Sequence, residues 1–335
     1  MKIENTYQVL VQQIKNTYEE GKAKAIKVVR RELVLTYWAV GKHIVEYEQK
    51  GNEKAEYGSK ILSRLAKDLS DQLGRGFSRT NLINMRLMYI KYPNISLLSD
   101  QLSWGHIVEL LSVENELERG FYEKQTILEK WTVRELKRQK KSSLFLRLAA
   151  SKDKAGILRL AKSGNQVETP QDIFRDSYVF EFLKIPEPFQ ISEEKLETLL
   201  LDNLQSFLLE LGKGFTFVGR QYKILVDNEY YRIDLVFYHR FLRCFVLIDL
   251  KTEKVKHKDI GQMNMYLGYF AKEEYFEGDN PPIGIILTRQ KNELLVEYAT
   301  YGMSSQLFVS KYQLYLPNEE ELRAELEQIL LKEGK

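Results

Sequence analysis

The stretch that decides the fold of the C-terminal half is residues 230–251, YYRIDLVFYHRFLRCFVLIDLK. Its two runs of apolar residues are rich in β-branched and aromatic side chains, which favours two strands, over 230–238 and 243–250. His239 and Arg240 are expected to form the turn between them. A third strand-like run, 215–226, lies upstream of a turn at 227–229. The pattern therefore predicts three consecutive strands joined by tight turns.

Two carboxylates interrupt these apolar runs. Because side chains alternate across a strand, Asp234 is expected on the face opposite to Ile233, Leu235 and Phe237. Asp249 and Lys251 share one face of the next strand. A carboxylate is costly to bury alone, and a divalent cation between two of them would remove that cost. Oxygen ligands suit Mg²⁺ or Mn²⁺, and Lys251 could then position a water or stabilise charge on a phosphate. The alternative is a plain Asp234–Lys251 salt bridge at the end of a sheet.

The surrounding elements predict a mixed sheet flanked by helices. A helix over 193–211 precedes the three strands and a helix over 258–271 follows them. An apolar strand over 283–288 and a final helix over 319–331 come later in the chain. The order αβββαβ is that of an α/β or α+β domain with helices packed on a sheet.

Three more side chains on these helices are candidates for the site. Gln262 and Tyr266 are four residues apart and share a helix face, so they could position a base, a phosphate or water. The alternative is a surface glutamine over a core tyrosine. Glu210 borders the apolar side of the helix over 193–211 and is a candidate third acidic metal ligand. A solvated glutamate at a helix end explains Glu210 equally well.

The N-terminal half is predicted to be entirely helical, because its apolar residues recur at three- and four-residue spacing. We expect helices over 6–50, with a break near Gly21, over 57–73, and from an N-cap at Ser78 to residue 92. A capping box of Thr132 and Glu135 begins another helix. The sequence thus divides into a helical domain over 1–150, a basic linker over 151–175 and a mixed-sheet domain over 176–335.

Residues 57–92 have the pattern of a helix-turn-helix, in which the second helix reads the major groove. This pattern predicts base contacts and phosphate contacts, and a basic cluster further along the chain would follow phosphates. The candidate residues are Arg79, Thr80, Asn81 and Asn84 for bases, and Arg75, Arg86, Lys140 and Lys141 for phosphates. Plain helical bundles also contain this geometry, so packing alone is the alternative.

Composition bounds the class of protein. The net charge of +3 conceals a basic half, with 30 Lys and Arg against 19 Asp and Glu in residues 1–165, and an acidic half, with 20 against 28. A basic half is typical of nucleic-acid binding. The alternative is a solvated helical surface that carries mixed charges. The single cysteine excludes an intrachain disulfide. We expect no signal peptide, no membrane helix and a cytoplasmic protein.

Taken together, these motifs resemble the PD-(D/E)XK nuclease superfamily. Over nearly the full chain, the sequence is similar to the YhcG-like family of bacterial PD-(D/E)XK proteins. The phrases that carry the resemblance are AEYG (55–58), GFSRTNL (76–82), LSW (102–104), WTVREL (131–136), FVGRQ (217–221), IDLVFYHR (233–240), GQMNMY (261–266) and PPIG (281–284). The chain departs from the motif in having Ile233 where its proline stands and Asp249 as the second acid.

The resemblance implies a helical DNA-binding domain joined to a restriction-endonuclease-like domain. It implies that Asp234 and Asp249 bind the metal, that Lys251 is the catalytic lysine, that Gln262 and Tyr266 are accessory, and that Glu210 is the helical acid. We therefore expect a Mg²⁺-dependent DNA endonuclease, with Mn²⁺ as a possible substitute and a homodimer as a plausible assembly. The alternative function is a non-catalytic DNA-binding or scaffold protein with a vestigial nuclease fold.

Overall fold

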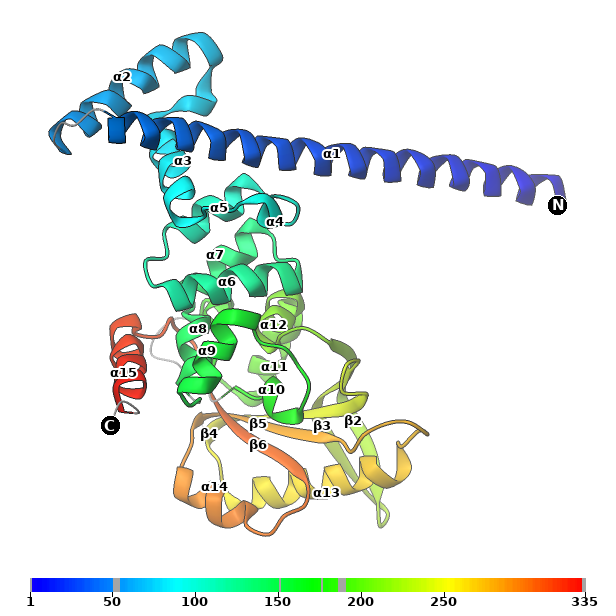
Figure 1. Cartoon of the computed structure of the whole chain (residues 1–335). Helices are drawn as coiled ribbons and strands as arrows, with labels where there is room; N and C mark the ends of the chain where they lie inside the picture. The colour runs from blue at the N-terminus through cyan, green and yellow to red at the C-terminus, as the bar shows by residue number, and fades with distance from the viewer. Residues whose placement is uncertain (1, 51–54, 151, 176, 186–190, 333–335) are drawn as a thin grey trace. The chain divides into compact units, whose positions relative to one another are not determined.

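The computed structural model (Figure 1) describes residues 2–50, 55–150, 152–175, 177–185 and 191–332, except the side chains of 2–6, 50, 55–60, 75, 97 and 332. The chain divides into two compact units, Met1–Lys137 and Arg138–Lys335. The boundary expected near residue 150 therefore differs from this division and falls inside the second unit. Along the described residues, no helix combines the length and apolar character needed to cross a membrane.

The first unit is helical throughout its described residues, as predicted. Its elements are α1 (Lys2–Lys50), α2 (Ala55–Leu73), η1 (Arg75–Phe77), α3 (Arg79–Lys91), α4 (Ser96–Ser99), α5 (Trp104–Leu111), α6 (Glu116–Glu129) and the first part of α7 (Val133–Lys141). Both predicted caps are present. The Ser78 hydroxyl accepts a hydrogen bond from the Asn81 amide. The Thr132 hydroxyl and the Glu135 carboxylate each accept from the other's main-chain N–H.

Helix α1 is unbroken at Gly21, contrary to the expected interruption. A single glycine costs a helix only about 1 kcal/mol relative to alanine, which the long flanking segments tolerate. Side chains 7–33 are exposed, and burial begins at Val34. Beyond this point α1 packs closely on α3. The two helices are so close at Gly41 that a Cβ there would overlap the main-chain carbonyl of Met85.

The start of the second unit replaces the expected linker. Helices α8 (Leu144–Ala149), α9 (Lys154–Ser163) and α10 (Pro170–Ile173) occupy most of residues 144–173. Helix α9 begins at an Asp153 N-cap and buries Ile157 and Leu160. Lys154, Arg159 and Lys162 thus lie on an amphipathic helix, which is why charge alone gave the appearance of a linker.

The second unit contains a mixed sheet, as predicted. Its remaining elements are β1 (Ser177–Val179), η2 (Glu181–Leu183), α11 (Glu193–Asp202), α12 (Leu204–Leu211), β2 (Phe215–Val226), β3 (Glu229–His239), β4 (Cys244–Lys254), α13 (His257–Glu273), β5 (Ile283–Gln290), α14 (Glu293–Thr300), β6 (Gln306–Gln313) and α15 (Glu319–Lys332). Within the described residues the sheet has the order β1-β6-β5-β4-β3-β2. The pairs β2–β3 and β3–β4 are antiparallel, and the others are parallel. The helix expected over 193–211 is interrupted at Asn203 and forms α11 and α12.

Each face of the sheet has its own hydrophobic core. One core joins α11 and α12 to side chains such as Leu235, Phe237 and Ile248. The other joins α13 to side chains such as Ile233, Val236 and Leu247. Figure 1 shows α11 and α13 on opposite sides of the strands. The expectation that Ile233 shares a face with Leu235 was therefore wrong, because the alternation in β3 is interrupted at Asp234.

Candidate functional site

The candidate site lies where β3 and β4 separate. Their antiparallel ladder ends at the pair Leu235–Ile248. Beyond that pair, β4 continues its parallel pairing with β5 from Asp249 to Lys254. The Leu250 amide, which β3 no longer engages, donates instead to Asp234 Oδ2 at 2.8 Å. This bond fixes the Asp234 carboxylate at the fork between the two strands.

Asp249 and Lys251 enter the same fork from β4. Asp249 is only 4 % exposed, and the Lys251 ammonium lies 2.7 Å from Asp249 Oδ2. The ammonium also lies 3.5 Å from Glu193 Oε2 on α11 and donates to the Leu250 carbonyl at 3.2 Å. The Asp234–Lys251 salt bridge considered from the sequence is therefore not the pairing found here, since Lys251 pairs with Asp249 and Glu193.

The charges in the fork are not balanced. Burial, and then the negative charge of Asp234, raise the pKa of Asp249 to about 7, against the lowering effect of Lys251. Burial alone would lower the pKa of Lys251, but the Asp249 carboxylate outweighs it and raises that pKa above its usual range. Lys251 is thus held protonated, and a negative charge at Asp249 is costly until a further cation approaches.

The carboxylates of the fork fit a magnesium ion whose remaining ligands are water and substrate phosphate. Across the described residues, no group of three or more His, Cys, Asp or Glu side chains could hold a metal. Mg²⁺, however, is usually bound by one or two carboxylates together with water and substrate phosphates. Asp234 and Asp249 supply such a pair, and burial together with the charge of Asp234 raises the pKa of Asp249 even though Lys251 lies beside it.

Gln262 and Tyr266 lie beside this fork on α13. The Gln262 amide donates to the Tyr266 hydroxyl, which in turn donates to the Arg232 carbonyl at 3.1 Å. Burial raises the pKa of Tyr266, and the charges of Asp249 and Asp234 raise it further. Tyr266 is fully buried whereas Gln262 is exposed. This arrangement is the surface glutamine over a core tyrosine, placed within electrostatic range of the acids.

Glu210 does not join the fork, which corrects its expected role as a third metal ligand. Its carboxylate is completely buried and accepts from Arg147 at 2.7 Å, from Arg138 at 3.2 Å and from the Val179 amide at 3.0 Å. Arg175 lies 3.5 Å away. Burial would raise the pKa of Glu210, but the three guanidinium groups outweigh it and lower that pKa. Glu210 is a structural anion that joins α12 to α7, α8 and β1.

The acids that do approach the fork are on α11, and the sequence did not single them out. Glu193 contacts Lys251 and also accepts from the Thr252 amide at 3.3 Å. Glu197 is 2 % exposed and is linked to Asp234 through the Gln221 amide, which donates to both carboxylates. The available signal was the spacing of four between Glu193 and Glu197, which places both on one helix face. Charges at such spacing are common on solvated helices, so this signal was weak.

The predicted DNA contacts of the first unit occupy mixed environments. Arg79 and Thr80 are exposed at the N-terminal end of α3. Asn81 is half-buried and its side chain donates to the Gly76 carbonyl at 3.0 Å. Arg86 forms a 2.6 Å ion pair with Glu48 of α1, so its guanidinium is already engaged. Asn84 is half-buried, and the side chain of Arg75 lies outside the described residues.

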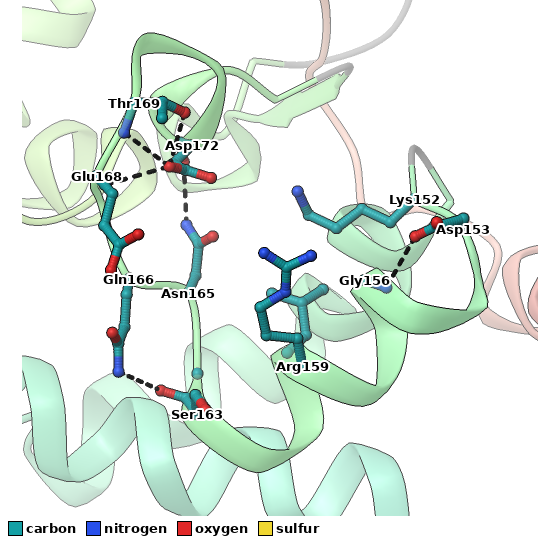
Figure 2. Close-up of a pocket in the computed structure, with 12 residues that line it drawn as sticks. Lys152, Asp153, Gly156, Arg159, Ser163, Asn165, Gln166, Glu168, Thr169 and Asp172 are labelled. Carbon is teal, nitrogen blue, oxygen red and sulfur yellow. Dashed lines mark hydrogen bonds between the residues drawn. The ribbon is translucent and has the colours of Figure 1, made fainter.

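Lys140 and Lys141, the other predicted phosphate contacts, belong to the second unit. Near them in sequence is a polar pocket of about 430 Å³ around α9 and α10 (Figure 2). Lys152 and Arg159 extend into it, but Asp153, Glu168 and Asp172 line it as well. Asp153 and Asp172 bond to main-chain amides at helix starts. The pocket favours neither sign of charge and contains none of the residues of the fork.

Comparison with known proteins agrees with this architecture. Residues 171–327 match the family model described as the YhcG PDDEXK nuclease domain. Residues 13–147 match the model of the DUF1016 N-terminal domain. The chain is 35 % identical over 362 aligned positions to the Escherichia coli (strain K12) protein named "Putative nuclease YhcG", covering 98 % of this chain and 96 % of that protein.

Two solved structures show local similarity. A repair endonuclease from Pyrococcus abyssi matches with a TM-score of 0.28 and 18 % identity, over 39 % of this chain and 50 % of that one. EndoMS in complex with dsDNA matches with a TM-score of 0.27 and 14 % identity, over 40 % and 50 %. The family models and the full-length relative decide the assignment: this chain belongs to the YhcG family of proteins with a PD-(D/E)XK nuclease domain.

Proposed function

We propose that this PD-(D/E)XK protein is a metal-dependent DNA endonuclease that hydrolyses phosphodiester bonds. The observation that carries the proposal is the fork between β3 and β4, which collects Asp234, Asp249 and Lys251 in a space short of positive charge. A divalent cation would correct this shortage, and the bound cation would in turn attract a phosphate.

Each residue of the fork has a distinct part in this reaction. Asp234 and Asp249 would hold Mg²⁺, or Mn²⁺ in its place. When bound, the ion supplies a water of lowered pKa and neutralises charge that develops on the phosphate. Lys251, kept protonated by its carboxylate neighbours, is suited to stabilise a phosphate oxygen rather than to accept a proton.

The helical first unit is proposed to bind the DNA. Of the predicted base contacts, Arg79 and Thr80 at the start of α3 are the exposed ones, whereas Asn81 and Asn84 are half-buried. Lys140 and Lys141 are proposed to contact phosphates without regard to sequence. A homodimer and a cytoplasmic location remain predictions.

The proposal is tested by cleavage of labelled duplex, branched and single-stranded DNA and of RNA, with Mg²⁺, Mn²⁺ or EDTA. Asp249→Asn and Lys251→Ala are compared with Lys254→Ala, which changes an exposed lysine on the same strand. We expect metal-dependent cutting by the wild type and by Lys254→Ala, and none by the other two variants.

Binding of the same DNA substrates separates the two functions considered from the sequence. If all four proteins bind DNA equally and none cuts any substrate with either metal, the protein is a DNA-binding scaffold and the nuclease proposal fails. If cutting persists in EDTA, the metal-dependent part of the proposal fails on its own.

A further inference from the structure

Gln221 is an irregular residue in the middle of β2. Its φ is +47°, a left-handed conformation that only glycine and, less often, asparagine and aspartate adopt readily. The flanking residues pair regularly with β3, Arg220 with Leu235 and Tyr222 with Ile233. Gln221 therefore occupies the register position opposite Asp234, and no Gln221–Asp234 pair belongs to the ladder described for these strands.

The side chain of Gln221 links two buried acids. Its amide nitrogen donates to Asp234 Oδ1 at 3.1 Å and also to Glu197 Oε2 on α11. A primary amide nitrogen carries two hydrogens, so one goes to each carboxylate. Both Asp234 oxygens are then fixed, Oδ1 by Gln221 and Oδ2 by the Leu250 amide. Each oxygen keeps a further lone pair for another ligand.

The left-handed backbone accounts for this contact. Adjacent residues of a regular strand point to opposite faces, yet Arg220 and Gln221 both reach Glu197, with Arg220 Nε 3.0 Å from Glu197 Oε1. A strained non-glycine conformation persists where surrounding contacts impose it. Here those contacts are the hydrogen bonds from Gln221 to the carboxylates of Asp234 and Glu197.

Resting on the proposed function, we propose that Gln221 is a positioning residue of the nuclease site. Its left-handed backbone aims one amide between Asp234 and Glu197, so that the Asp234 carboxylate is held in a single orientation for a divalent cation. Glu197 is the anchor, because burial keeps it in place and its other oxygen is held near Arg220. Through Gln221, the position of Glu197 on α11 determines the orientation of the Asp234 carboxylate on β3.

The test measures Mn²⁺ binding by electron paramagnetic resonance, together with thermal unfolding and DNA cleavage. Gln221→Gly accepts the left-handed backbone but lacks the amide, and Gln221→Asn keeps an amide on a residue that tolerates this backbone. Asn228→Gly is the matched control, since Asn228 has a φ of +63° in the β2–β3 turn. We expect Mn²⁺ affinity to fall by about 10- to 100-fold in Gln221→Gly, to recover partly in Gln221→Asn, and to stay unchanged in Asn228→Gly.

The outcomes distinguish this inference from the function on which it rests. Wild-type affinity for Mn²⁺ in folded Gln221→Gly, with cleavage to match, would overturn the positioning role and leave the nuclease proposal intact. A loss of thermal stability with unaltered Mn²⁺ affinity would make Gln221 a purely structural residue, which also overturns it. If the wild type neither binds Mn²⁺ nor cuts, it is the proposed function that fails.

Discussion

Two buried carboxylates in the second unit have opposite surroundings. Glu210 is held by three guanidinium groups and a main-chain amide, and its pKa is lowered despite complete burial. Asp249 shares its fork with Asp234 and has Lys251 as its nearest cation, and its pKa is raised. The depth of burial therefore does not by itself show whether a carboxylate is structural or binds a ligand. A carboxylate that the protein neutralises is structural, and one left short of positive charge is available to a ligand.

The largest effect is expected from a change at Glu210. Glu210→Gln leaves Arg138, Arg147 and Arg175 without their shared anion, and removal of one partner of a buried ion pair costs about 3–5 kcal/mol. We expect the free energy of unfolding, measured in urea, to fall by this amount while cleavage per folded molecule is unchanged. Glu319→Gln, in an exposed pair with Arg323, serves as the control and should cost under about 1 kcal/mol. A loss as small as the control's would remove Glu210 from its structural role.

The reciprocal change is Asp249→Asn. It removes a carboxylate that burial and Asp234 disfavour, so the metal-free protein should be no less stable than the wild type. Cleavage should fall by about 100- to 1000-fold, the scale on which loss of one stabilising group acts on kcat. Single-turnover cleavage and urea unfolding measure the two effects. Parallel losses of activity and stability would contradict the contrast with Glu210.

The pH dependence of stability should have opposite signs at the two acids. The folded pKa of Asp249, about 7, lies above its ordinary 3.8, so its contribution is complete below pH 3.8 and is lost as pH rises through 7. The pKa of Glu210 lies below its ordinary 4.5, so its contribution is present above pH 4.5 and is lost as pH falls through the folded pKa.

Urea unfolding in EDTA from pH 3 to pH 8 measures both slopes. We expect Asp249→Asn to remove the decline in stability towards pH 7, and Glu210→Gln to remove the decline on the acid side. The same slope at pH 5–7 in the wild type and in Asp249→Asn would show that another group controls that range.

The smallest effect is expected at the edge of the fork. Tyr266→Phe deletes the hydroxyl that donates to the Arg232 carbonyl, a bond worth about 0.5–1.5 kcal/mol. Cleavage should change by less than about tenfold, because Tyr266 acts on the acids only from a distance. Tyr298→Phe, on a 72 % exposed ring, is the control. A loss of cleavage as large as that of Asp249→Asn would place Tyr266 among the groups that touch the substrate.

The sequence predicted what local pattern controls. The apolar run before Asp249 and Lys251 identified the strand and its charged end, and short-range polar spacing located the caps at Ser78 and Thr132. The order of elements from α11 to β5 followed from the same patterns, whereas β1 was not predicted. The strands were found because runs of β-branched and aromatic residues favour strands.

Long-range partnership was not predictable in the same way. Glu210 looked like a possible ligand because a helical wheel shows burial but not which cations approach from residues 138, 147 and 175. Glu197 looked like an ordinary helix-surface charge until β2 brought Gln221 beside it. The left-handed turn at Gln221 has no sequence signal, because glutamine is not a residue that favours it.

The pairing of β1 with β6 sets the order of events during synthesis. Ser177 lies opposite Lys311, so the partner of this edge strand is 134 positions later in the chain (311 − 177). At 5–20 residues per second, a ribosome needs roughly 7 to 27 seconds to make that stretch. Strand β1 therefore has no partner strand until residues 311–313 have been synthesised. A chain that ends before β6 cannot form the β1–β6 pair, so the sheet of the nuclease domain is finished only after β6 has been translated.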